Sequence, residues 1–294
     1  MTIQPSKSLV SILLVARDAA PTIGLALASL LAQDNVDWEC QIVDDASTDG
    51  TANLLSRLID PRFRVQRSSK RLGRGGARNL ALERAKGCYL ASLDADDFLF
   101  PGALEAQMRV LEDAPSLSAC TGSLLLFSPN DRPIGRRRTQ LSPGVHQIRS
   151  PLTTRLPLGP TMVRRNLVGA NRFQESLKRS EDRDFYERVL DRGRVRVLPD
   201  LTYAYRWNLT LENVMLGLEN REALFCRSLL SSPLRSASQL VWTRWKRLCY
   251  PALGSWGLWE VLNRWRAVPA TAEEVVLFEQ TLSALSRVKV FSSP

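Results

Sequence analysis

The chain has 294 residues, of which 44% are hydrophobic and 24% charged, and its formal net charge is +10. This length and composition fit a globular protein with one large core and an appendage. Scattered cysteines without Cys-x-x-Cys spacing argue against a disulfide framework or a zinc site, and no apolar run approaches the roughly 18–20 residues of a membrane-spanning helix.

The first element is an apolar run at 9–16, which predicts a buried strand. Arg17 and Asp18 follow it, and after Pro21 the apolar residues recur at helical spacing. Because a single lysine precedes the run and a helix follows directly, we interpret it as a strand and not as a signal peptide. We therefore expect a cytoplasmic protein, able to work at the inner face of the membrane.

Two further strands are expected before residue 70, and polar residues follow each of them. The strand at 40–43 runs into Asp44 and Asp45, within a turn-forming cluster of Asp, Ser, Thr and Gly. A short strand at 63–65 precedes the glycine-rich basic segment 71–79, which we expect to be a loop that leads into a helix.

The most informative feature is the acidic triplet that follows the apolar strand at 89–93. Asp94, Asp96 and Asp97 lie within four residues, and like charges at such spacing repel unless a cation neutralises them. A divalent ion that also holds a diphosphate suits this, because Mg²⁺ favours one or two carboxylates plus substrate phosphates. In isolation, a solvated turn would explain the triplet equally well.

Strands and helices thus alternate through the first hundred residues. Such alternation predicts an α/β fold with a mostly parallel central sheet flanked by helices. The carboxyl ends of parallel strands meet at one edge, where open α/β sheets bind their ligands. We therefore expect the polar residues after each strand to form one site.

Five motifs in this order resemble those of family 2 glycosyltransferases of the GT-A fold: SILLVARDAAPTIGLALASLLAQ, VDDASTDGT, GRGGARNLAL, LDADD and SEDRDFYERV. The resemblance runs from about residue 11 to about residue 207. It implies a Rossmann-like sheet and inverting transfer of a sugar from a nucleotide-diphosphate donor, commonly UDP-linked, with Mg²⁺ or Mn²⁺ at the diphosphate. The acceptor would be a hydroxyl of a glycan or lipid-linked molecule in cell-surface polysaccharide or glycolipid synthesis.

The resemblance also implies roles for the acidic residues. Asp96 would be the direct metal ligand, Asp94 would face the ribose or the bridging region, and Asp97 would tune or share the metal site. Asp182, which follows Glu181 at the start of a helix, would be the base that deprotonates the acceptor hydroxyl. Glu181 would orient it.

Donor binding would involve residues of the earlier motifs. Asp45 would accept a hydrogen bond from the ring N–H of the base, with Asp44 beside it. Arg78 and the backbone amides near Gly73 would steady the negative charge of the donor. Arg17 stands where the family usually has an aromatic residue, and a guanidinium can also stack on a base.

One departure concerns the metal. Many members carry a histidine after a late Tyr-Arg pair, but here Tyr205-Arg206 is followed by Trp207 and Asn208. The only histidine, His146, lies far upstream in a Pro-Gly context, so a histidine ligand is not expected.

Other interpretations stay open. Asp44 and Asp45 can cap a helix, and Glu181 and Asp182 can be ordinary first-turn acids. A nucleotidyltransferase shares the sheet and the acidic site but usually has a glycine-rich basic loop after its first strand. A non-catalytic protein that binds nucleotide sugars or membranes is the third class. A dinucleotide-binding loop is disfavoured, because Arg78 occupies the third glycine position.

We place the catalytic domain at 1–208 and a helical extension, rich in Trp and Arg, at 209–294. Within it, segment 242–266 interleaves five tryptophans with basic residues, a composition typical of peripheral membrane contact, although packing on the catalytic domain explains it equally well. The last segment predicts an amphipathic helix. No nucleic-acid-binding motif accompanies the positive charge, so nucleic acid is not an expected partner.

Overall fold

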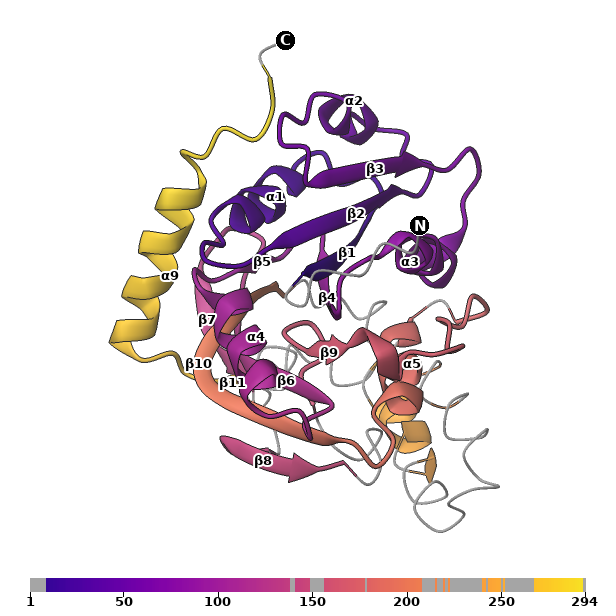
Figure 1. Ribbon diagram of the computed structural model, residues 1–294, viewed down its shortest axis with the longest axis vertical. Coiled ribbons are helices and arrows are strands. Elements are labelled where there is room, and N and C mark those ends of the chain that lie inside the picture. The colour runs from indigo at the N-terminus through magenta and orange to yellow at the C-terminus, as the bar shows by residue number, and fades with distance from the viewer. Residues whose placement is uncertain are drawn as a thin grey trace.

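The structure, a computed structural model, describes residues 9–137, 141–148, 156–177, 179–207 and 267–292, together with residues 215, 219, 222, 240, 241, 243–249 and 251. The described strands form one mixed sheet with helices packed on its faces (Figure 1). This confirms the predicted α/β class.

The N-terminal half follows the predicted alternation. Its four parallel strands lie in the order β3-β2-β1-β4, and every connection between them carries a helix. In chain order the elements are β1 (Val10–Ala16), α1 (Ile23–Leu31), β2 (Trp38–Asp44), α2 (Thr51–Leu55), β3 (Phe63–Arg67), α3 (Gly73–Arg84) and β4 (Tyr89–Asp94).

The second half extends the sheet to the order β11-β7-β6-β9-β4, with β10 running parallel to β6 and antiparallel to β5 and β8. Antiparallel β9 separates β4 from β6. The elements are β5 (Phe98–Leu99), α4 (Ala103–Asp113), β6 (Ala119–Phe127), β7 (Pro133–Arg137), β8 (Gly144–Gln147), β9 (Met162–Arg164), the 3₁₀ turn η1 (Arg165–Leu167), α5 (Glu181–Val189), β10 (Arg194–Arg206), β11 (Ala267–Val268) and α9 (Ala272–Leu285).

One expected loop is a helix instead. Helix α3 begins at Gly73, so most of the glycine-rich segment forms its first two turns. The glycines of this segment serve close packing and not backbone flexibility. A Cβ on Gly75 would lie 2.7 Å from the carbonyl oxygen of Gln174. Glycine here lets the chain before α5 pass against α3.

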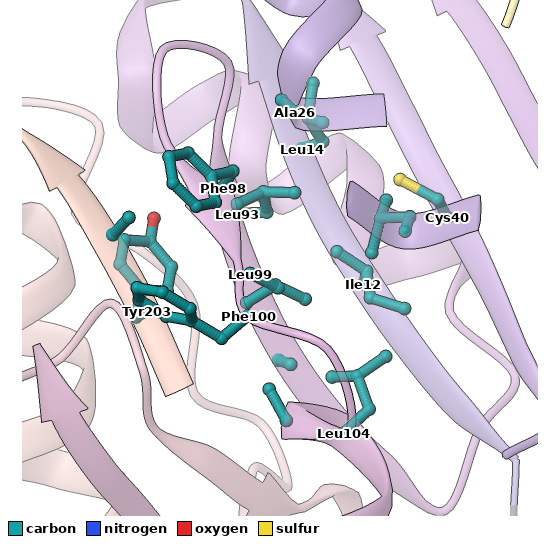
Figure 2. Close-up of a cluster of buried hydrophobic side chains, with 14 of the residues drawn as sticks. Ile12, Leu14, Ala26, Cys40, Leu93, Phe98, Leu99, Phe100, Leu104 and Tyr203 are labelled. Atoms are coloured by element: carbon teal, nitrogen blue, oxygen red, sulfur yellow. The ribbon is translucent and has the colours of Figure 1, made fainter. Parts of the chain in front are cut away.

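Successive side chains of β1 point to opposite faces of the sheet, so the hydrophobic core has two layers. Ile12 and Leu14 belong to the cluster that includes α1, α4 and α9, whereas Leu13 faces the cluster of α3 and α5. Figure 2 shows Phe98 and neighbouring side chains of the first cluster between Tyr203 of β10 and the side chains of β1. The sheet is therefore buried on both faces, as a mostly parallel sheet requires.

The C-terminal segment 267–292 belongs to this core. Strand β11 pairs with β7, and Arg136 of β7 donates a hydrogen bond to Glu274 of α9. The fully buried ring of Phe278 lies 5.6 Å from that of Phe98 and 5.4 Å from that of Phe127. Segment 267–292, which the sequence assigns to the helical extension, thus packs against the strands and helices that precede it in the chain.

Replacing Phe278 with Ala should lower the free energy of unfolding by about 3–5 kcal/mol, because it leaves a cavity among aromatic rings. Val276 is 50% exposed on the same helix, and Val276→Ala should cost less than about 0.5 kcal/mol. Urea denaturation measures both. Equal, small losses would contradict the inclusion of α9 in the core.

Candidate active site

The ends of three parallel strands bring the predicted polar residues to one edge of the sheet. Ala16 of β1 pairs with Asp44 of β2, and Val15 pairs with Asp94 of β4. Arg17, which follows β1, donates a hydrogen bond from Nη1 to the carbonyl oxygen of Asp45 at 3.1 Å. The strand register thus places these segments together at one edge of the sheet, as expected.

The three carboxylates of the acidic triplet come together but differ in their surroundings. Oxygens of Asp94, Asp96 and Asp97 lie within 4.8 Å of one another. Asp97 is buried, and it accepts hydrogen bonds from the hydroxyl of Tyr203 at 2.8 Å and from the backbone N–H of Arg206 at 2.7 Å. Asp96 has an exposed side chain.

The pKa values of the triplet diverge for physical reasons. Desolvation and the neighbouring charge of Asp94 raise the pKa of Asp96. Burial, reinforced by the charges of Asp96 and Asp94, raises the pKa of Asp97 well above its usual range. Burial also opposes ionisation of Asp94, but Arg78 and Arg74 outweigh it and lower its pKa.

This donor set fits a hard divalent cation. Carboxylate oxygens are the ligands that Mg²⁺ and Mn²⁺ accept, and clustered like charges favour a cation between them. Asp96 is the best placed to bind directly, because its side chain is exposed, whereas both oxygens of Asp97 already accept hydrogen bonds. His146 lies in β8, where Nε2 is 2.8 Å from the carbonyl oxygen of Ser142, and it does not line the cavity described below.

A buried arginine links the triplet to the helix that carries the predicted base. Arg78 of α3 is 5% exposed. It donates from Nη2 to Asp94 at 2.8 Å and from Nη1 to Glu181, which is 1% exposed. Arg74 contacts the same two carboxylates, Asp94 at 3.2 Å and Glu181 at 3.1 Å.

Sequence reasoning identified Arg78 but missed Arg74. Their spacing of four residues places both on one face of α3, a signal that appears only when the glycine-rich segment is helical. Each of the two carboxylates therefore meets two guanidinium groups, and this pairing compensates the cost of burying Glu181.

Besides its predicted role in donor binding, Asp45 holds the start of helix α3. Its carboxylate accepts hydrogen bonds from the backbone N–H groups of Leu72 at 2.5 Å and Gly73 at 3.0 Å, so it caps the start of α3. Asp44 is buried, accepts a hydrogen bond from the N–H of Ser47 and lies 3.3 Å from Nε of Arg67. A base ring N–H would have to share Asp45 with those two amides.

Asp182 lines a polar cavity of about 240 Å³. The cavity lies between the acidic triplet and the start of α5, and its lining includes Asp94, Asp97, Glu181 and Asp182. Asp182 accepts a hydrogen bond from the N–H of Arg183 through Oδ1 at 2.7 Å. The structure thus brings the predicted base to the same cavity as two members of the acidic triplet, Asp94 and Asp97.

Comparison with known proteins agrees with the motifs. The model of the family described as Glycosyl transferase family 2 matches residues 11–164. A putative teichuronic acid biosynthesis glycosyltransferase, TuaG of Bacillus subtilis, is 38% identical over 122 residues, 41% of this chain and 48% of that protein. The succinoglycan biosynthesis protein ExoU of Rhizobium meliloti is 30% identical over 211 residues, 66% of this chain and 61% of that protein.

A third relative is the Escherichia coli protein WfgD, named as a UDP-Glc:α-D-GlcNAc-diphosphoundecaprenol β-1,3-glucosyltransferase, 35% identical over 103 residues, which are 35% of this chain and 41% of that protein. The aligned region thus spans less than two thirds of each of these relatives. Among solved structures, Staphylococcus aureus TarS, residues 1–349, matches with a TM-score of 0.60 at 20% identity, covering 94% of this chain and 79% of that one. This likeness supports the fold.

The different surroundings of Asp96 and Asp97 predict different costs of substitution. Asp96→Asn should weaken Mn²⁺ binding in the presence of UDP by more than about 100-fold, because a direct ligand is lost. Asp97→Asn keeps a carbonyl for the Arg206 amide and an amide for the Tyr203 oxygen, and should weaken Mn²⁺ binding by only about 10-fold, the low end for a residue that acts through the ligands. Electron paramagnetic resonance of free Mn²⁺ measures both. Losses of equal size would make Asp97 a direct ligand.

Proposed function

The chain belongs to glycosyltransferase family 2, and from this premise we propose that it is an inverting glycosyltransferase that uses a nucleotide-diphosphate sugar. The observation that carries the proposal is one cavity lined both by carboxylates from the end of β4 and by the two acids that open α5. A metal-bound leaving group and a base are the two things that inverting transfer requires.

UDP is the proposed nucleotide, and a lipid-linked or glycan hydroxyl is the proposed acceptor. WfgD is named for a UDP-Glc donor and a diphosphoundecaprenol-linked acceptor, and a TarS structure is a complex with UDP-GlcNAc. TuaG and ExoU are named for teichuronic acid and succinoglycan biosynthesis. These names support a role in the synthesis of a cell-surface polysaccharide.

Donor binding is assigned to the strand ends. A divalent metal, when bound, would stabilise the negative charge that develops on the departing diphosphate. Asp96 would bind that ion directly, and Asp94 and Asp97 would shape its site. Arg17 and Asp45 would face the nucleoside, with the buried Asp44 beside them. Arg78 would keep Asp94 fixed beside the diphosphate, and Gly73 at the start of α3 would hold Asp45 through its backbone N–H.

Asp182 is the proposed base. It lines the cavity in the first turn of α5 and is half-buried, so an acceptor hydroxyl can reach it. Glu181 is buried against Arg78 and Arg74, so it acts as a positioning residue that holds the start of α5. Asp182 would therefore transfer the proton, and Glu181 would hold the start of α5 in position.

If Asp182 is the base, Asp182→Asn should reduce transfer by about 10²–10⁴-fold, because the side chain no longer accepts a proton. Donor binding should persist, since the triplet and α3 are unchanged. Radiolabelled sugar transfer and calorimetry with UDP separate the two effects. Glu181→Gln should cost less, as it keeps an oxygen for Arg78. Should Glu181→Gln abolish transfer while Asp182→Asn does not, the roles are reversed.

Peripheral membrane contact is the second part of the proposal. Among the described residues, no helix combines the length and hydropathy that crossing a bilayer demands. Most of segment 242–266 lies outside the described residues, including Trp242, Trp256, Trp259 and Trp265. Of the described part, Trp245 is 50% exposed, while Arg244 and Arg247 form ion pairs with Glu222. That pairing lowers the charge this segment offers to a membrane.

Vesicle co-sedimentation tests this contact. The protein should sediment with anionic but not neutral vesicles at low ionic strength, because each cation near an anionic leaflet contributes about 1 kcal/mol. Changing Arg244, Lys246 and Arg247 together to Glu should abolish that binding.

A control with the same charge change, placed on the exposed residues Arg64, Arg84 and Lys86, should bind vesicles nearly as well as the wild type. An equal loss of vesicle binding in both triple variants would show that binding depends only on the net charge of the protein. No binding to any vesicle would mean that the segment packs on the protein.

A further inference from the structure

The cavity between the acidic triplet and α5 is lined by more arginines than acidic residues. Five arginines and four acidic residues line it, so its formal charge is positive even with every carboxylate ionised. Arg74 and Arg78 bind Asp94 and Glu181, on the side of the triplet. The other three, Arg137, Arg179 and Arg183, lie around the same cavity as Asp182.

We propose that Arg137, Arg179 and Arg183 form a subsite for a phosphate group of the acceptor, beside the base Asp182. The inference rests on the proposed function, because it assigns this side of the cavity to the acceptor. It goes beyond that function by naming the charge of the acceptor and the residues that recognise it.

Two of the three arginines flank the base in the chain. Arg179 precedes Ser180, whose φ of 65° turns the backbone into α5, and Arg183 lies in the first turn of that helix. The partial positive charge of a helix N-terminus also favours an anion there. Both arginines are half-buried, which strengthens a contact with phosphate relative to one in open water.

Arg137 reaches the same cavity from the opposite part of the sheet. It ends β7, where it pairs with Ala267 of β11, so the C-terminal strand fixes its backbone. Its charge is close enough to Tyr205 to oppose the burial that raises the pKa of that phenol. The three guanidinium groups thus come from two separate parts of the fold.

Phosphate is the anion that this arrangement suits best. Guanidinium groups present paired N–H donors that match phosphate oxygens, and several of them share the charge of a diphosphate. In a sugar linked to a lipid through a diphosphate, only the width of one ring separates the reacting hydroxyl from the phosphate. A base and a phosphate subsite in one cavity of about 240 Å³ match that separation.

The experiment occupies the donor site first. Calorimetry would titrate two probes into protein saturated with UDP and Mg²⁺: geranyl diphosphate, for a lipid-linked phosphate, and glycerol 3-phosphate, for a phosphate within a glycan. At least one should bind saturably. Arg137→Gln and Arg183→Gln should each weaken that binding by about tenfold or more, the usual worth of a charge-assisted contact, without changing UDP affinity.

Arg132→Gln is the matched control, because Arg132 is exposed just before β7 and does not line the cavity. It removes the same charge and should leave probe binding unchanged. A preference for geranyl diphosphate would support a lipid-linked source, and a preference for glycerol 3-phosphate would support a glycan source.

Absence of probe binding to the UDP-saturated wild type, or unchanged affinity in both cavity variants, would overturn the subsite while leaving donor binding intact. A loss as large in Arg132→Gln would overturn it too, because only net charge would then matter. Failure of UDP itself to bind would remove the proposed function, and the subsite with it.

Discussion

The buried guanidinium of Arg78 is the contact on which the site depends. It joins Asp94 at the end of β4 to Glu181 at the start of α5, two segments far apart in the chain. A buried charge is costly unless it is paired, and here each carboxylate meets both Arg78 and Arg74. Removing either acid would leave a buried cation unbalanced, so the proposed metal site and the proposed base are held in one geometry.

The acidic triplet depends in the same way on strand β10. Tyr203 donates to Asp97 through its hydroxyl and also accepts a hydrogen bond from the N–H of Asp94, and Arg206 donates to Asp97 from its backbone. These contacts fix the turn after β4, so that Asp96 is left exposed where a cation can bind. The three neighbouring acids thus have three different environments, set by burial, hydrogen bonds and ion pairs.

The far end of the chain supports this arrangement through packing. Phe278 of α9 fills the core against Phe98, which directly follows the triplet, and β11 extends the sheet beside β7. Helix α9 therefore supports the site indirectly, by packing in the hydrophobic core behind the acidic triplet. The spacing of residues in the sequence does not indicate this contact. Arg137 is placed by the same C-terminal strand.

The sequence by itself determined the α/β class, the parallel strands and the gathering of polar residues at their ends, because hydrophobic periodicity and strand direction are local properties. Only the tertiary structure decided that Asp45 caps α3, that Arg74 shares the ion pairs of Arg78, and that 267–292 joins the core. Each of these depends on contacts between residues distant in the chain, such as Gly75 against Gln174. Periodicity fixes which face of an element is buried, but not which distant segment covers it.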